Sequence, residues 1–119
     1  MLPQAKALEA KVLSSFGDNA NMSEQLRPTM FTEYVGTQFD LLDDPASAVD
    51  LTLTSVVEHV KTEHQEVFSL FFHGPAARFV PQGIHKLNHP ALGELELFLV
   101  PVAQDKQGFQ YEAAFNNLI

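Results

Sequence analysis

Apolar and polar residues alternate with a period of two over most of the chain after Thr37. Successive side chains of a β-strand point to opposite faces, so this alternation predicts strands rather than helices. Gly, Pro, Asp and Asn gather between the alternating stretches, where turns form. We expect six strands, at residues 39–42, 51–58, 67–73, 84–89, 94–102 and 109–115.

Each of the longer predicted strands has one apolar face. Within each strand, the residues expected to share a face are Leu51, Leu53, Ser55 and Val57, then Phe68, Leu70 and Phe72, then Leu95, Leu97 and Leu99, and finally Phe109, Tyr111, Ala113 and Phe115, which we expect to point inward. Short turns without intervening helices indicate antiparallel neighbours. The fold class we expect is therefore mainly β: a small antiparallel six-stranded barrel or sandwich, preceded by one or two short helices. Of the two, we favour a partly closed barrel.

The first part of the chain has a helical pattern instead. Leu8, Val12 and Phe16 recur every four residues, which predicts a short helix over residues 4–16. A second short helix is expected from an N-cap at Thr29 to a left-handed residue at Gly36. We divide the chain into an N-terminal helical segment or arm, residues 1–22, and an antiparallel β domain, residues 23–119. We expect the arm to pack either on its own domain or on a neighbouring subunit. In the second case the protein would be a homo-oligomer.

The composition is that of a globular domain with a core built on phenylalanine. The chain has 119 residues, of which 45% are hydrophobic, with ten Phe and no Trp. It has no cysteine, which excludes disulfides and thiolate metal ligands. No apolar run is long enough to span a bilayer, and the N-terminus lacks a signal-peptide pattern. We expect a cytoplasmic protein by default, with assembly into an appendage as the alternative.

The formal net charge of −8 narrows the class of partners. Binding to a phosphate backbone needs clustered Lys and Arg, and the seven such residues here are scattered. We therefore expect neither nucleic acid nor a membrane as a partner. The acidic residues serve solubility.

Histidines, carboxylates and serines are the candidates for chemistry. His85 and His89 fall on the same side of a predicted strand, but four residues of strand span about 13 Å, too far for one metal ion. Glu94 and Glu96 alternate with leucines and form a solvated face. Ser69 lies mid-strand, without the glycine-flanked turn of a hydrolase nucleophile. We assign no catalytic, cofactor-binding or metal-binding residue, and expect no cofactor and no enzyme.

The loop after Gly74 and Pro75 is the predicted contact surface. It carries Arg78 and Phe79, and an exposed aromatic residue beside an arginine is typical of an interaction anchor. The contacts expected with a partner or ligand are Arg78, Phe79, His85 and His89. The alternative for Phe79 is burial under the barrel. A second opening for a partner is an unpaired edge of the first or last strand.

Several segments resemble a bacterial family of domains of unknown function, number 6916. They are residues 68–75 (FSLFFHGP), 81–83 (PQG), 89–102 (HPALGELELFLVPV) and 111–116 (YEAAFN), with Phe31, Gly36 and Phe39 fitting the family's beginning. The resemblance covers about residues 29–117. It implies small, mostly stand-alone bacterial proteins with no assigned activity and no catalytic residues to carry over. It also implies an association with proteins like phage tail collars.

The function expected from these observations is that of a non-enzymatic protein-interaction module. Such a module would be an accessory, adaptor or assembly chaperone of a larger bacterial or phage tail-fibre-like or collar-domain protein. The alternative is a β-barrel that binds a small ligand or carbohydrate at its mouth, near Arg78, Phe79, His85 and His89. A deep pocket there would favour the alternative, whereas a filled core would count against it.

Overall fold

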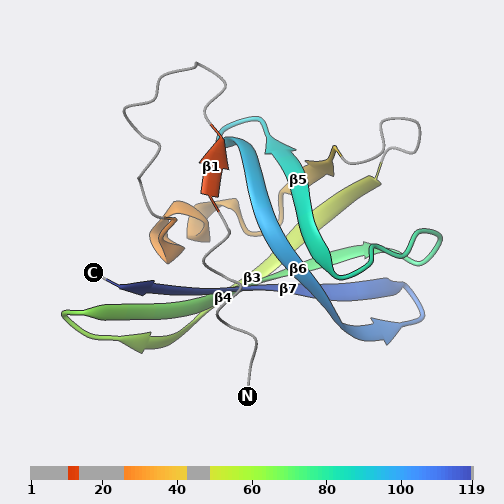
Figure 1. Cartoon of the computed structure of the whole chain (residues 1–119). Coiled ribbons are helices and arrows are strands. Elements are labelled where there is room, and N and C mark those ends of the chain that lie inside the picture. Colours follow the sequence, from red (N-terminus) through yellow and green to blue (C-terminus); the bar gives the residue numbers. More distant parts are fainter. Residues whose placement is uncertain (1–10, 14–25, 43–48, 119) are drawn as a thin grey trace.

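All six strands predicted from the alternating pattern form. The computed structural model describes residues 11–13, 26–42 and 49–118. Its elements are β1 (Lys11–Leu13), the 3-10 helices η3 (Pro28–Met30) and η4 (Thr32–Tyr34), and the strands β2 (Gln38–Leu41), β3 (Val49–Lys61), β4 (Gln65–Pro75), β5 (Gly83–His89), β6 (Gly93–Asp105) and β7 (Gly108–Leu118) (Figure 1). The predicted loop at residues 43–47 lies outside the described residues.

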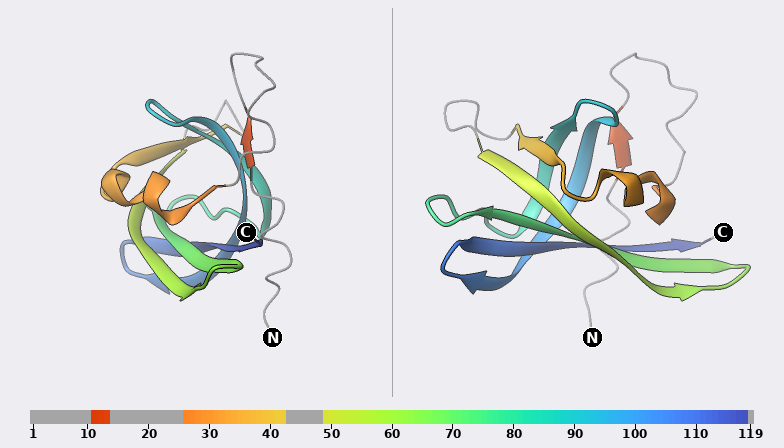
Figure 2. Two further views of the ribbon diagram at one scale, coloured as in Figure 1. Left: turned by 90° about the vertical axis from the view of Figure 1, so that its left-hand side faces the viewer. Right: turned by 180° about the vertical axis from the view of Figure 1, so that it is seen from behind.

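The six strands β2 to β7 form one antiparallel sheet that closes on itself. Neighbours follow the order β6-β5-β2-β3-β4-β7, and β7 pairs again with β6. Figure 2 shows this ring end-on in its left view. Closure removes most of the unpaired edge that an open sheet would carry. The expected mainly β, barrel-like fold is thus confirmed.

The inside of the ring is filled by side chains from every strand of it. Phe68 stacks on Phe115 with ring centroids 4.5 Å apart, and Phe39 meets Phe72 edge-on at 5.2 Å. The fully buried leucines are Leu51, Leu53, Leu70, Leu87, Leu95, Leu97 and Leu99. Each such side chain contributes about 1.5–3 kcal/mol by leaving water. The predicted phenylalanine-based core is confirmed.

Extra residues in the strands change which side chains point inward. β3 has a register shift between Leu53 and Ser55, so that Thr54 is an additional residue relative to β4. Such a bulge reverses the phase of the alternation that follows. Val56 therefore packs against the core, while Ser55 and Val57 lie in register with Phe71 and Ser69 of the outer face. The prediction that Ser55 and Val57 share a face with Leu51 and Leu53 is wrong for this reason.

Residues 28–34 form two 3-10 turns instead of one helix capped by Thr29. Pro28 occupies the first helical position, where its fixed φ and missing N–H fit, so the helix begins two residues earlier than a cap at Thr29 predicts, with Arg27 as its cap. Phe31 is buried and Tyr34 packs against the core, and their spacing of three suits a 3-10 turn better than an α-helix. Gly36 has φ +93°, the left-handed conformation expected after the helix.

The helix predicted over residues 4–16 is wrong where the structure describes that segment. Lys11–Leu13 is the strand β1, paired antiparallel with Glu96, Leu95 and Glu94 of β6 (Figure 1). A short isolated helix is marginal, whereas a strand edge offers hydrogen bonds that are ready to be made. The rest of that prediction, and the boundary between residues 22 and 23, lie outside the described residues.

Candidate functional site

The loop of residues 76–82 covers one end of the ring. Its Val80 is buried, and the backbone N–H of Val80 donates a hydrogen bond of 2.9 Å to the Tyr111 hydroxyl inside the ring. Burial raises the pKa of Tyr111, so the phenol stays neutral near pH 7. Val80, and not Phe79, is thus the residue that anchors this loop.

Phe79 and Arg78 are more accessible than Val80. The Phe79 ring is 50% exposed and meets Phe109 edge-on, with centroids 5.1 Å apart. Arg78 is half-buried beside it and lowers the pKa of Tyr111 slightly through its charge. The loop therefore presents an aromatic ring held in place from beneath, as a contact residue needs.

His85 belongs to the support of the loop. It is buried, and its Nε2 lies 2.7 Å from the Pro81 carbonyl oxygen. Because that oxygen can only accept, Nε2 carries the proton and donates it. His85 thus ties the start of β5 to the loop that carries Phe79, and takes a structural position.

His89 lies at the other end of β5. Its Nδ1 accepts hydrogen bonds from the N–H groups of Ala91 at 3.0 Å and Leu92 at 3.3 Å. The ring proton is therefore on Nε2, which donates to Thr37 Oγ1 at 3.0 Å, and that hydroxyl donates to the Tyr34 carbonyl. Burial lowers the pKa of His89 and the Asp40 charge raises it by less, so the neutral ring is favoured. The four predicted contact residues thus do not converge on one site.

A pocket of about 590 Å³ opens beside His89 on the outside of β2. Its lining residues are Tyr34, Gly36, Thr37, Gln38, Asp40, Thr52, His89 and Pro90. Asp40 lies in register with Asp50 of β3, and a hydrogen bond from Asp40, followed by burial and the Asp40 charge, raises the pKa of Asp50. Within the described part of the chain, no group of three or more His, Asp and Glu residues has an arrangement that could hold a metal ion.

Ser69 takes part in a hydrogen-bond chain on the outer face of the ring. Its hydroxyl donates to Glu112 Oε2 at 2.6 Å and accepts from His59 Nε2 at 3.0 Å. In a hydrolase the histidine lies between the serine and the carboxylate. Here the serine lies between them and is 1% exposed, so its proton is directed to Glu112. The chain joins three neighbouring strands and gives Ser69 no nucleophilic role.

The ring has a split between β6 and β7. Residues 108–112 of β7 pair with both β4 and β6, whereas residues 113–118 pair with β4 alone among the described strands. β6 pairs with β7 over residues 100–105 and with β1 over residues 94–96. The last strand is therefore interior to the sheet in its first half and an edge in its second half.

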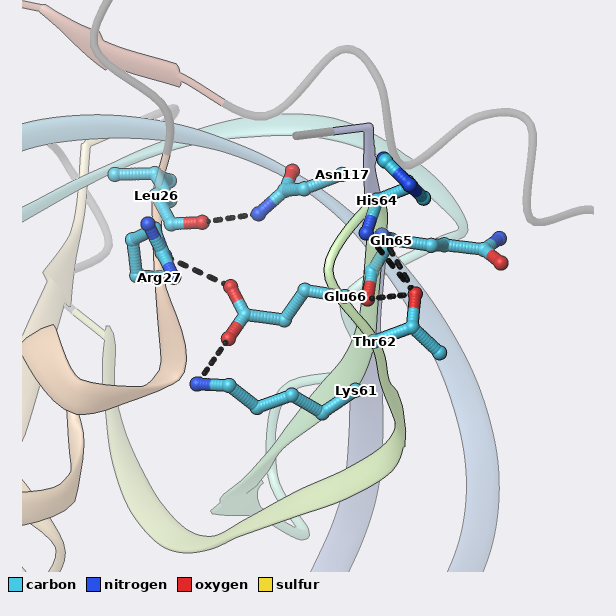
Figure 3. Close-up of polar contacts among 8 residues, drawn as sticks. All are labelled: Leu26, Arg27, Lys61, Thr62, His64, Gln65, Glu66 and Asn117. Atoms are coloured by element: carbon cyan, nitrogen blue, oxygen red, sulfur yellow. Dashed lines mark hydrogen bonds and ion pairs between the residues drawn. The ribbon is translucent and has the colours of Figure 1, made fainter.

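Residues 26–34 lie across the end of the ring where β4 begins and β7 ends. Leu26 and Phe31 are buried, and Asn117 Nδ2 donates a hydrogen bond of 2.6 Å to the Leu26 carbonyl (Figure 3). This bond ties the segment to the edge half of β7. Leu26 and Phe31 of the segment add to the apolar core at this end of the ring.

A buried carboxylate fixes the same segment. Glu66 is 1% exposed; its Oε1 accepts a hydrogen bond from Arg27 Nε at 2.8 Å, and its Oε2 forms an ion pair with Lys61 Nζ at 3.4 Å (Figure 3). A bulge at His59 turns Lys61 to the side of β3 that faces Glu66. A buried charge is tolerated when it is paired in this way. The sequence carried no signal for this contact, since Arg27 and Glu66 are 39 residues apart.

The geometry defines a class of protein: a small, closed antiparallel β-ring with a filled interior, an anchored aromatic loop at one end and a split strand edge. The described part of the chain contains no helix long and apolar enough to cross a membrane.

Comparison with known proteins gives the family. The model of the domain of unknown function DUF6916 matches residues 26–115, which is more than half of the chain, and the protein belongs to this family. The resemblance noted over about residues 29–117 is thereby confirmed. No curated protein and no solved structure matches the chain significantly.

Proposed function

We propose that this protein is a non-enzymatic interaction module, an accessory, adaptor or assembly chaperone of a larger protein. The observation that carries the proposal is the filled interior of the ring, which directs binding to loops and strand edges. Phe79 is the aromatic residue best placed for it, because it is exposed while Val80 and His85 hold its loop rigidly from below. Rigid aromatic anchors lose little conformational entropy on binding.

The partner class follows from charge and from the family. A net charge of −8 disfavours nucleic acid and anionic membranes. The resemblance implies an association with tail-fibre-like or collar-domain proteins, and such a protein is the partner that we propose. The acidic surface is suited to a partner with basic residues at the contact.

The test is co-expression with the product of the neighbouring gene, followed by size-exclusion chromatography at micromolar concentration. We expect co-elution, and we expect Phe79→Ala to weaken the complex by about tenfold or more, as loss of an aromatic anchor does. Val35→Ala removes a similarly exposed apolar side chain elsewhere and is the matched control. Separate elution of the two wild-type proteins would contradict the proposal.

The pocket beside His89 favours a second candidate function, binding of a small polar ligand or carbohydrate. Its lining combines the Tyr34 ring with the hydroxyls of Thr37 and Thr52 and the carboxylate of Asp40, and an aromatic side chain with a few polar groups is typical of a small-ligand site. Titration calorimetry with a panel of oligosaccharides distinguishes the two functions. Binding that Asp40→Ala abolishes and Phe79→Ala leaves unchanged would favour the ligand-binding protein.

A further inference from the structure

The pocket on the outside of β2 contains a carboxylate that forms no ion pair with a Lys or Arg among the described residues. This carboxylate is Asp40, whose neighbours in register are Asp50 of β3 and Asn88 of β5. Neither neighbour is basic, and like charges directly opposite each other on paired strands are destabilising. Lys86, two residues before Asn88, is in register with Glu96 on the other side of β5. A positively charged group entering the pocket would therefore be stabilised by Asp40.

The same pocket presents an aromatic ring in a fixed position. The Tyr34 ring meets the His89 ring edge-on, with centroids 4.8 Å apart. Thr37 holds the backbone of Tyr34, because its N–H and its hydroxyl both donate to the Tyr34 carbonyl oxygen, at 3.0 Å and 2.6 Å. The face of an aromatic ring attracts a cation through its quadrupole, and a ring that is already held loses little conformational entropy on binding. Tyr34 and Asp40 line one pocket, so both favour a cation there.

The remaining side chains of the lining add acceptors and no positive charge. His89 is the residue of the lining that could become cationic, but burial lowers its pKa and its Nδ1 accepts from the Ala91 N–H, so the ring is neutral. Gln38 and Thr52 lie in register on β2 and β3, and both line the pocket. A primary ammonium group has three N–H donors. The Asp40 carboxylate, the Thr52 hydroxyl and the Gln38 amide oxygen can accept from them.

The volume of the pocket suits an organic cation rather than a metal ion. It is about 590 Å³, within the range of about 300–1,000 Å³ that is usual for small-molecule sites. Among the described residues, no three His, Asp or Glu side chains are arranged to hold a metal.

We propose that this pocket binds a primary ammonium group, with Asp40 as its counter-ion and its charge against the Tyr34 ring. The group belongs either to a free organic amine or to a lysine side chain of a partner protein. This inference rests on the second candidate function, ligand binding at this pocket, and specifies the charge of the ligand.

The first test compares pairs of probes that differ in charge and in little else. The pairs are butylamine with butanol, and glucosamine with glucose. Each probe is titrated at pH 7 and low salt into the isotope-labelled full chain, and binding is followed by the backbone amide signals in NMR spectra. We expect the amine of a pair to bind at least about tenfold more tightly than its hydroxyl counterpart and to shift the signals of Gln38, Asp40 and Thr52. Equal affinities within both pairs, or shifts confined to other residues, overturn the proposal.

Two substitutions test the roles of the carboxylate and the ring. Asp40→Asn keeps the shape of an exposed side chain and removes its repulsion with Asp50, so the variant should fold, yet it should bind the amines at least about tenfold more weakly. Tyr34→Leu should weaken binding about two- to fivefold through loss of the cation–π contact, and urea unfolding verifies its fold because Tyr34 packs against the core. Glu58→Gln changes an exposed carboxylate of β3 outside the pocket and should leave binding unchanged. Amine binding that survives Asp40→Asn overturns the proposal.

Two further measurements identify the source of the ammonium group and separate this inference from the ligand-binding function. If Asp40→Asn weakens the complex with the neighbouring gene product as much as it weakens amine binding, the group is a lysine of that partner. If that complex is unaffected while the amines bind, the group belongs to a free amine. If a neutral oligosaccharide binds the pocket and neither amine does, the ligand-binding function stands and the ammonium assignment is wrong. If no probe binds the pocket, both are wrong.

Discussion

Glu66 and His89 are polar residues whose side chains each contact several partners. These contacts fix how segments far apart in the chain meet. Glu66 is a carboxylate that the pattern places in a polar turn, yet it is buried and paired with Arg27 and Lys61. His89 was predicted as a contact residue, yet its two ring nitrogens hold the turn after β5 to the loop before β2. The residues that bury these two side chains and bind them come from distant parts of the chain. Residue type alone therefore did not predict the contacts.

The pairing of Glu66 predicts the effect of Arg27→Ala. Removing the guanidinium leaves a buried carboxylate with one remaining partner and loosens residues 26–34. We expect a loss of about 1–2 kcal/mol in the free energy of unfolding, less than for a fully buried pair because Arg27 is 42% exposed. Urea unfolding at pH 7 measures it. Glu63→Ala, at a 93% exposed position nearby, is the control, and a similar loss in that variant would refute the assignment.

The lowered pKa of His89 predicts a pH dependence of stability. Burial disfavours the charged ring in the folded state, whereas the unfolded chain takes up this proton near its ordinary pKa of 6.5. The unfolded state therefore binds more protons just below pH 6.5, so the contribution of His89 is complete above that pH and is lost as the pH falls.

Urea unfolding between pH 5 and pH 8 checks this dependence. His89→Gln should unfold more easily at pH 8 and lose less stability on acidification than the wild type. His64→Gln, at an exposed position, should keep the wild-type slope. Equal slopes in all three proteins would show that His89 does not titrate as inferred.

At the scale of elements, the alternating pattern predicted the strands well and their phase less well. Leu95, Leu97 and Leu99 face inward as expected, because β6 is regular there. β3 departs from the expectation because extra residues at Thr54 and His59 shift its register against β4. A bulge depends on which strand is the neighbour, and that is decided only when the sheet forms.

The register of β3 predicts that deleting His59 is tolerated about as well as truncating it. His59 is the extra residue between Glu58 and Val60, so a ladder without it leaves Lys61 in register with Glu66. Both the deletion and His59→Ala lose the bond to Ser69. We expect the free energies of unfolding of the two variants to differ by less than about 1 kcal/mol, as measured by thermal unfolding. A deletion that unfolds far more easily than His59→Ala would show that the bulge itself stabilises the end of β3.

At the scale of the whole molecule, closure of the ring decides what remains available to a partner. β7 closes the ring against β6 with its first half, whereas its second half pairs with β4 alone among the described strands and is tied to Leu26 by Asn117. The buried core comes from residues 26–115, the segment that matches the family model. The ring should therefore be the unit that folds cooperatively.

Deletion of residues 1–22 tests this division. We expect a protein that still unfolds in one cooperative transition, because the described core lies outside the deleted segment. Its self-association or partner binding should weaken, since β1 is removed from β6. Calorimetry and size-exclusion chromatography provide the two measurements. Loss of the cooperative transition would show that the N-terminal segment belongs to the core.

The sequence by itself determined the mainly β class, the six strands, most of the inner face and the family, because period-two alternation and turn residues act locally. The final strand illustrates the limit of that information. The alternating pattern predicted that its residues Tyr111, Ala113 and Phe115 point inward, and they are buried. Whether it closes a barrel or remains an edge depends on β6, and only the tertiary structure showed that it does both. The pairing of Glu66 and the phase of β3 were decided in the same way, by contacts between residues far apart in the chain.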